Sequence, residues 1–547
     1  MDSAAAESQS SQHHDDDIHM GPKNEGIIHS EKLNIQTQKP FNTLSAIGIG
    51  YGTTNTAVGI LLVLGSTIPL GGSPLFFWGF LVMMMIALAT ATSLAELASA
   101  MPHAGGQYLW VSQLAPENCR RGLSYCTAML SWLGAVATGA SACLSVSTGV
   151  CDIIAFLNPD FVYQRWMGFV GFQVLNLLTL GCAAFEHALP GISNTMLFFS
   201  CASCLAVFVA LFATSHGHVS ARDFFFATVN VSGWQDGIGF LVGIGGINWS
   251  LCCLDVATHL AEEIPSPATN VPKVLMWTVA VGAFSGMLVI VAIFANLPII
   301  DANQDNSAVA LFYRISSSRA LAVGILVPIL ITTAGAVWSM QIWQSRIAWA
   351  ISRDGGFPLH RYLARVLPAP FHTPFWSLLW SSTCSALFGC LYLGSEVAFS
   401  SLIATGVLLL YFSYSIPVIL VLFQGRSTFR HGPFWFPILG YISNVVMLAW
   451  TVVAAIFYCF PYHSVVQAEN MNYASLVLGV IALFICTLWF SFANRHYAIL
   501  EGAFIVSSYL GQVYNERSGL GELKVEQGES GRRREKEINI KKLEGKT

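Results

Sequence analysis

The sequence predicts an all-α membrane protein with about twelve transmembrane helices. Its 547 residues are 54% hydrophobic and only 10% charged, and the mean hydropathy of +0.59 is far above that of a soluble domain. Apolar runs that could cross a hydrocarbon core of about 30 Å, each about 20 residues long, recur through residues 41–494. Strands of a membrane barrel would be about ten residues long with alternating polarity, so these runs are expected to be helices.

The predicted spans form one permease-like membrane domain, residues 41–494, between two polar tails. The tails, residues 1–40 and 495–547, have too little apolar content to fold alone and are expected to be disordered. Neither has the pattern of a cleavable signal peptide, so the first span is expected to act as the insertion signal. In chain order, the spans are expected at residues 41–66, 75–101, 122–150, 167–187, 192–214, 237–260, 276–299, 320–350, 375–393, 399–423, 435–460 and 473–493.

The distribution of positive charge predicts that both tails lie in the cytoplasm. With that orientation, 22 of the 26 Lys and Arg residues fall on the inner side and 4 on the outer side, as expected for cytoplasmic loops. The sequon "NVS" at Asn230 then lies in an outer loop and is expected to accept a glycan. No retention signal is visible at the C-terminus, and the plasma membrane is the expected location, with a vacuolar membrane as the open alternative.

No metal site, cofactor, nucleic-acid partner or enzyme activity is expected. The 13 cysteines lie mostly within apolar spans and show no paired framework. The segment "HHDDDIH", residues 13–19, is typical of a solvated tail. The chain also has no "HExxH" helix motif, nucleophile elbow or phosphate-binding loop.

The first span contains a polar interruption. Its segment "IGIGYGTTNTAVG" places several glycines around four polar residues, which is poor material for an uninterrupted lipid-facing helix. A break is therefore expected there. The polar residues are Thr53, Thr54, Asn55 and Thr56.

The sixth span contains a second interruption, followed by charged residues. Its segment "GIGGINWSLCC" predicts another break. Beyond it, Asp255, His259 and Glu262 follow the i, i+4, i+7 spacing of one helical face, and charges at membrane depth are kept mainly where they face a cavity or each other. That face is expected to line a polar path, whereas Glu263 is expected to mark the water-facing end of the helix.

The two breaks lie five spans apart, which predicts two inverted repeats, residues 41–214 and 237–423, followed by two extra helices in residues 435–493. Paired broken helices in corresponding positions indicate a transporter site. Half-helix ends there present N–H groups to an anion and carbonyl groups to an ammonium, which suits a zwitterion.

Three longer motifs carry a family resemblance: "SLAELASAMPHAGGQYLWVSQLAP" at 93–116, "NWSLCCLDVATHLAEEIPSPATNVPK" at 248–273, and "SRDGGFPLHRYLARV" at 352–366 followed by "TPFW". With them, the chain resembles the amino acid/polyamine/organocation permeases, most closely the fungal branch that carries amino acids, γ-aminobutyrate and choline. The resemblance implies a LeuT-like 5+5 inverted repeat with broken helices 1 and 6, two added helices, and alternating access.

The resemblance also assigns candidate substrate residues. The unwound segment of span 1 falls on Thr54, Asn55 and Thr56, where many amino acid carriers have small residues, often glycines, so side chains can replace some backbone contacts to a carboxylate. The unwound segment of span 6 falls on residues 250–254. That segment comprises Ser250, Leu251, Cys252, Cys253 and Leu254, and all of these except Leu251 are substrate candidates. The neighbouring Thr53 in span 1 and Trp249 in span 6 are added to the candidates.

Proton symport is the expected coupling. Sodium would need a cage of oxygen ligands, whereas a proton needs one titratable group that is exposed alternately to the two sides. Asp255 is the leading proton site, because burial favours the neutral form of a carboxyl group, with His259 and Glu262 as exit steps. Glu96, near the inner end of span 2, is expected to make a structural hydrogen bond or to serve an inner gate.

The expected substrate is a small nitrogen-containing solute: an amino acid, γ-aminobutyrate or choline. Tyr51, Trp132, Trp249 and Trp343 are candidate aromatic walls, which could hold a quaternary ammonium or simply pack. Two alternatives stay open, a nutrient receptor of the same fold with little transport and an exporter of a metabolite. The expected partners are thus the solute, protons and the lipid bilayer.

Overall fold

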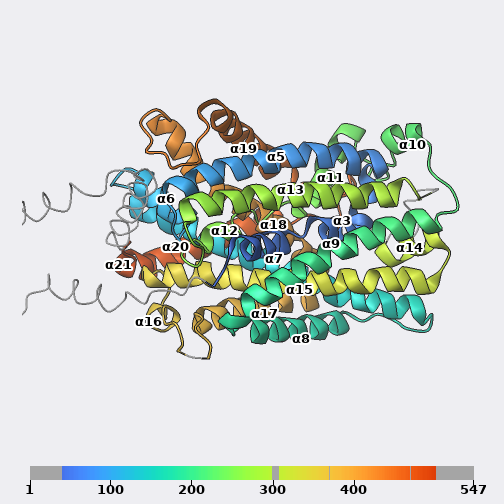
Figure 1. Ribbon diagram of the computed structural model, residues 1–547, viewed down its shortest axis with the longest axis horizontal. Coiled ribbons are helices and arrows are strands. Elements are labelled where there is room, and N and C mark those ends of the chain that lie inside the picture. Colours follow the sequence, from blue (N-terminus) through green and yellow to red (C-terminus); the bar gives the residue numbers. More distant parts are fainter. Residues whose placement is uncertain (1–39, 298–306, 369, 468–469, 500–547) are drawn as a thin grey trace, which may run out of the picture. The chain divides into compact units, whose positions relative to one another are not determined.

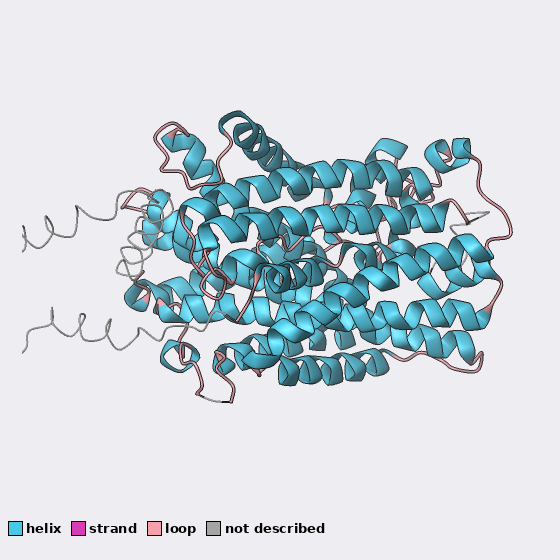
Figure 2. Ribbon diagram, viewed as in Figure 1, coloured by secondary structure: helices cyan, strands magenta, loops and turns pink. Residues whose placement is uncertain are grey.

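The computed structural model describes residues 40–297, 307–368, 370–467 and 470–499, and within these ranges all regular structure is helical (Figure 2). Ten helices there are long and apolar enough to cross a membrane. A bent pair in residues 43–70 adds an eleventh span. The sixth predicted span is covered by two shorter helices, α11 (Asp236–Trp249) and α12 (Val256–His259). The all-α membrane fold with about twelve spans is thereby confirmed.

The long helices follow the predicted spans in order (Figure 1). Several begin at a recognisable start signal, such as a proline in the first turn of α9, α13 and α19, or the Ser395 hydroxyl group that accepts a hydrogen bond from the Ala398 N–H at the start of α18. The long helices are α5 (Gly72–Ala100), α7 (Arg120–Leu157), α8 (Arg165–Ala183), α9 (Leu189–Thr214), α13 (Pro267–Phe294), α15 (Arg319–Arg353), α17 (Phe375–Gly394), α18 (Glu396–Gln424), α19 (Pro437–Phe457) and α20 (Ala474–Leu488).

Short helices lie at the two ends of the bundle. Helices α6 (Gln107–Leu114), α16 (His360–Leu363) and α21 (Asn494–His496) lie at the first end, whereas α12 lies deeper in the bundle (Figure 1). Arg361 belongs to α16 and Arg495 to α21. At the opposite end lie α10 (Ala221–Phe226) and α14 (Ala308–Ser316). The first end corresponds to the predicted inner side.

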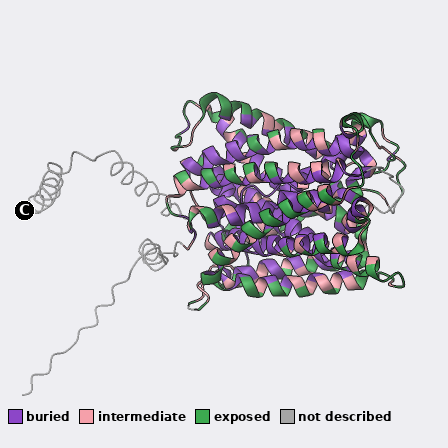
Figure 3. Ribbon diagram, turned by 45° about the vertical axis from the view of Figure 1, so that its right-hand side comes forward, coloured by how far each residue is buried: buried purple, intermediate pink, exposed green. Residues whose placement is uncertain are grey.

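Burial separates an interior from an apolar outer surface (Figure 3). Large apolar side chains such as Phe284, Phe423 and Ile438 are 73%, 85% and 77% exposed, as expected for a surface that lipid covers. Inside, α7 packs against α15 and α18, and α13 packs against α5 and α2 (Thr43–Thr54). The broken helices lie among these buried elements.

Candidate functional site

The first span is interrupted at a single residue. Helix α2 (Thr43–Thr54) ends and α3 (Thr56–Leu62) begins on either side of Asn55, whose φ of 35° and ψ of 57° are left-handed. The Asn55 side chain is itself held: its amide nitrogen donates to the Thr332 carbonyl oxygen at 3.3 Å, and its Oδ1 accepts from the Ser200 hydroxyl at 3.0 Å. A separate bend of 51° follows at Val63.

The three threonines around this break differ in their contacts. The Thr53 hydroxyl donates to the Ile49 carbonyl oxygen, and the Thr54 hydroxyl donates to the Tyr51 carbonyl oxygen, so both bond within their own helix. The Thr56 hydroxyl is fully buried and has no hydrogen-bond partner in the protein. Of the three, Thr56 thus has the hydroxyl group without a partner, and this group packs against Gly282 of α13.

The second break is longer and touches the first. Helix α11 ends at Trp249, and α12 begins at Val256, so residues 250–255 are not helical. A Cβ atom on Gly59 of α3 would lie 2.6 Å from the Ser250 Cβ, which is closer than real Cβ contacts. Only glycine fits there, and the two interrupted helices meet at this point.

The residues of the second break are mostly buried and bonded locally. The Ser250 hydroxyl donates to the Ile247 carbonyl oxygen, and the Leu254 side chain is 4% exposed. Trp249 is only partly buried, and its indole N–H donates to the Ser141 hydroxyl of α7 at 3.2 Å. The break thus presents an indole ring beside α7.

Asp255 and His259 lie side by side, in agreement with their i, i+4 spacing, and form a fully buried pair. Glu262, expected on the same face, contacts Arg353 and His103 instead. The His259 Nε2 lies 3.0 Å from the Asp255 Oδ2, and neither side chain is exposed. The His259 Nδ1 lies 2.8 Å from the Ala104 carbonyl oxygen, which can only accept, so Nδ1 carries a proton. The contact between Nε2 and Oδ2 then requires one further proton, held by either the imidazole or the carboxyl group.

Two residues that the sequence reasoning missed complete this network. The Gln107 amide of α6 donates to the Asp255 Oδ2 at 2.8 Å, and the Tyr414 hydroxyl of α18 donates to Oδ1 at 2.6 Å. Both donors favour the charged carboxylate. Gln107 stands inside the motif at 93–116, so its position in that motif was a usable signal, whereas nothing local marked Tyr414.

Glycine brings the α6 loop against this pair. Gly106 has a φ of 53°, and a Cβ atom there would lie 3.0 Å from the His259 Cε1. A side chain would be strained by the backbone angle and crowded by the ring. The loop can therefore deliver the Ala104 carbonyl group and Gln107 to the same pair.

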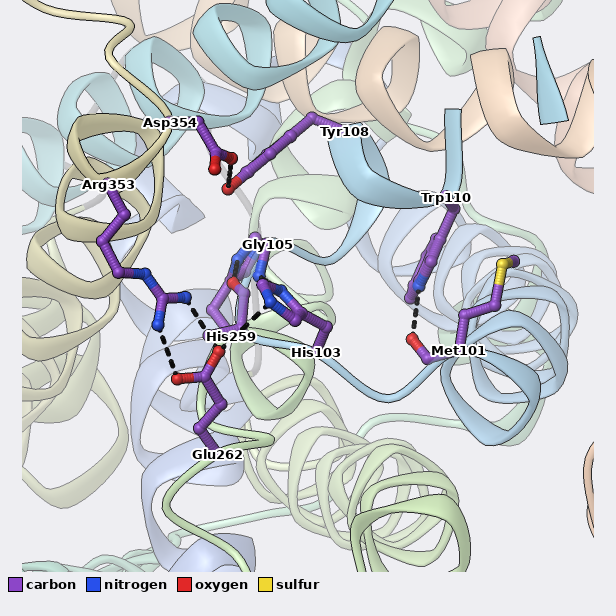
Figure 4. Close-up of polar contacts among 10 residues, drawn as sticks. Met101, His103, Gly105, Tyr108, Trp110, His259, Glu262, Arg353 and Asp354 are labelled. Carbon is purple, nitrogen blue, oxygen red and sulfur yellow. Dashed lines mark hydrogen bonds and ion pairs between the residues drawn. The ribbon is translucent and has the colours of Figure 1, made fainter. Parts of the chain in front are cut away.

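Glu262 lies beyond α12, and Figure 4 shows its carboxylate beside Arg353 and His103. Its carboxylate accepts two hydrogen bonds from Arg353, at 2.8 and 2.9 Å, and lies 3.5 Å from the His103 Nε2. Burial raises the pKa of Glu262, but the Arg353 charge and the hydrogen bonds from Arg353 and the Ala104 backbone outweigh it, so its pKa is lowered from 4.5 to about 2. Glu262 is thus a lasting carboxylate in a pair with Arg353, separate from Asp255.

His103 differs from His259 in how its ring is held. Its Nδ1 accepts from the Gly105 N–H at 2.9 Å, so the neutral ring carries its proton on Nε2, toward Glu262. Burial lowers the pKa of His103 to about 4, although the Glu262 charge acts in the opposite direction. His103 is therefore neutral at physiological pH.

Two further ion pairs close the same end. Glu263 is 5% exposed and accepts from Arg346 of α15 at 2.8 and 3.3 Å, so the expectation that it meets water was wrong. Its partner lies 83 positions away, where local periodicity gives no sign of it. Glu96 lies 2.9 Å from the Arg426 Nη1 and also accepts from the Phe436 N–H.

Asn230 lies between α10 and α11, at the end opposite the ion pairs (Figure 1). Its amide nitrogen, where a glycan would be attached, donates to the Trp234 carbonyl oxygen at 2.9 Å and to Asp236 at 3.0 Å. Glycosylation there stays a prediction. No cluster of three metal-ligating side chains occurs in the described ranges, and the "HHDDDIH" segment lies outside them.

Two interrupted helices that meet inside a bundle of membrane-spanning helices define a secondary transporter. Sequence comparison gives the same class: the family model described as "Amino acid permease" matches residues 41–483. The chain belongs to this family of permeases, within the amino acid/polyamine/organocation superfamily that its motifs resembled.

Its relatives are named as transporters. The chain is 58% identical over 475 residues to the "Transmembrane transporter swnT" of Metarhizium robertsii, covering 87% of this chain and 95% of the relative. It is 57% identical to the "Swainsonine transporter swnT" of Arthroderma benhamiae, covering 88% and 95%. It is 36% identical to the "Choline transporter" of Saccharomyces cerevisiae, covering 85% and 84%. The protein is thus a multi-pass membrane transporter of an organic solute.

Proposed function

We propose that the protein carries a small hydroxylated organic cation, of the kind that swainsonine and choline represent, by proton-coupled alternating access. The observation that carries the proposal is the 57% identity, over 88% of this chain, to a protein named as a swainsonine transporter. Swainsonine is a small polyhydroxylated bicyclic amine, and choline is a hydroxylated quaternary ammonium. Both present a cationic nitrogen and hydroxyl groups without a carboxylate.

The contacts at the two breaks support a cation over an amino acid. Asn55 occupies the centre of the first break, and its amide group already bonds to α9 and α15. The second break presents the partly buried indole ring of Trp249, and a cation over a tryptophan face gains about 0.5–2 kcal/mol. Thr56, with its unpartnered hydroxyl group, is the candidate for contact with a substrate hydroxyl.

The buried pair supports proton coupling. Because the His259 Nδ1 is committed to the Ala104 carbonyl group, Asp255 and His259 share one proton between Nε2 and Oδ2. Loss of that proton would leave a negative charge in the membrane interior, and its return restores a neutral pair. The pair is therefore expected to lose its proton only when the interior is open to water, and to regain it before the interior closes. The plasma membrane and cytoplasmic tails remain part of this proposal.

The first test is accumulation by purified protein in vesicles without sodium. Labelled swainsonine, choline, γ-aminobutyrate and alanine are compared under an imposed proton gradient of either direction. Gradient-driven accumulation of swainsonine or choline, but not of the two amino acids, is the expected result. Accumulation of only the amino acids would contradict the cation proposal. Binding without transport would favour the receptor alternative. Outward movement of the solute, driven by protons that move inward, would favour an exporter.

The two histidines near the inner end are expected to differ in their effect on pH dependence. The pKa of His103 lies near 4, below its ordinary 6.5, so the folded protein keeps the ring neutral above about pH 4. The free energy of unfolding that depends on this neutral ring decreases only as the pH falls from 6.5 toward 4. His103→Gln is therefore expected to leave the midpoint of the rate against pH unchanged between about pH 5 and 7.5.

The matched variant is His259→Gln, which removes the ring that shares a proton with Asp255. It is expected to move the midpoint or abolish the pH dependence. Initial rates of uptake at fixed membrane potential provide the measurement for both variants. A shift of the midpoint in His103→Gln, with His259→Gln unchanged, would reverse the assignment of the proton site.

A further inference from the structure

The two adjacent cysteines of the sixth span present their sulfur atoms side by side. Cys252 Sγ and Cys253 Sγ lie 3.3 Å apart, and the two side chains are 6% and 1% exposed. Neither is in a disulfide. We infer that this pair is a dithiol site for trivalent arsenicals, located in the break between α11 and α12.

Adjacency in the chain does not by itself bring two thiols together. Successive side chains point to opposite faces of a strand and lie well apart around a helix. Here the backbone is neither, because residues 250–255 are not helical and Cys253 has a φ of 62°. A residue other than glycine is strained in that left-handed region, so the surrounding packing imposes the arrangement.

The neighbouring contacts hold both sulfur atoms in place. Cys252 Sγ donates to the Trp249 carbonyl oxygen at 3.0 Å. Cys253 Sγ donates to the Thr138 hydroxyl of α7 at 3.8 Å. Two soft sulfur ligands, held side by side by other groups, suit a soft electrophile that forms two bonds. A monosubstituted trivalent arsenic is such an electrophile.

The reaction needs no oxidant. An arsenoxide, R–As=O, condenses with the two thiols: two S–H bonds break, two As–S bonds form, and the oxygen leaves as water with both protons. The arsenic keeps its oxidation state. The product closes a ring across Cys252 and Cys253 and so fixes the backbone of the break.

The test uses full-length protein in detergent, treated with phenylarsine oxide and measured by intact mass. About one bound phenylarsenic per chain is expected, released by a dithiol such as 2,3-dimercaptopropanol but not by a monothiol. Proteolysis and mass spectrometry of the labelled wild-type protein should place the adduct on the peptide with Cys252 and Cys253, which gives a result even if a cysteine variant fails to fold.

Matched variants separate this pair from others. Cys252→Ser and Cys253→Ser are each expected to lose the adduct. The double variant Cys201→Ser/Cys204→Ser removes the two cysteines one turn apart on α9 and is expected to keep it. No adduct on the wild type, or an adduct that survives Cys252→Ser and disappears in the α9 variant, would overturn the assignment.

Transport gives a second, separate readout that rests on the proposed function. The arsenical is expected to stop uptake in the wild type, and subsequent release of the arsenical by 2,3-dimercaptopropanol is expected to restore that uptake. If the arsenical binds the pair but the wild type carries none of the tested solutes, the dithiol site stands and the proposed function fails. If uptake proceeds unaffected while the pair is labelled, the ring does not restrain the break.

Discussion

Asp255→Asn is expected to abolish accumulation driven by a proton gradient. The asparagine amide has nearly the same shape as the carboxyl group, but it can neither take up nor release a proton. His259 would then face an amide, and the pair could no longer exchange the proton that Nε2 and Oδ2 share. Uptake of labelled cation into vesicles, with and without the gradient, measures the effect.

The control for this variant is exchange between labelled and unlabelled substrate, which needs alternating access but no net proton movement. Asp255→Asn is expected to retain exchange and to remain inserted and folded. Normal gradient-driven accumulation by the variant would refute the role of Asp255. Loss of exchange together with accumulation would indicate a structural role in place of a coupling role.

Tyr414→Phe is a milder change at the same site than Asp255→Asn. It removes only the hydroxyl group that donates to the Asp255 Oδ1 at 2.6 Å. A hydrogen bond to a charged group contributes about 1.5–3 kcal/mol, so its loss makes the charged carboxylate less favoured. The midpoint of the pH dependence of uptake should therefore shift to higher pH, while uptake itself is retained. A merely structural role of Tyr414 would lower the rate at all pH values alike.

Arg346→Met is expected to cause the largest loss of stability. Arg346 is 1% exposed, and its guanidinium group is the ion-pair partner of Glu263, which is 5% exposed. Removal of one member of a buried pair leaves an uncompensated charge, at a cost of about 3–5 kcal/mol in the free energy of unfolding. Thermal unfolding of the purified protein in detergent measures the change.

The double variant Glu263→Gln/Arg346→Met separates charge from packing. It removes the charges of both members of the pair, and the stability of the protein is expected to recover most of the loss. If the double variant is as unstable as Arg346→Met, packing around the arginine matters more than the pair. A stability of Arg346→Met close to the wild type would show that water reaches Glu263.

The sequence predicted those features that depend on local spacing. Glycines and polar residues placed the breaks near Asn55 and Ser250, and the i, i+4 spacing placed Asp255 beside His259. Residue types alone also marked Glu96 as a group that needs a hydrogen-bond partner or serves a gate, and it pairs with Arg426.

The remaining contacts depend on how distant helices pack. Gln107 precedes Asp255 by 148 positions and Tyr414 follows it by 159, so neither contact has a periodic signal. For the same reason Glu263 was expected in water, although Arg346 neutralises it inside the bundle. Periodicity shows on which side of a helix a charged residue lies, but not which residue of another helix will contact it.

The contact between Gly59 and Ser250 limits how the specificity of this transporter can diverge. With no space for even one methyl group, the two interrupted segments cannot be enlarged or shifted independently. A descendant protein that adapts to a bulkier cargo must therefore gain volume elsewhere, by trimming side chains on α7 or α15. The unwound segments would stay nearly constant while the surrounding helices diversify, so differences in substrate among such proteins should be sought in those walls.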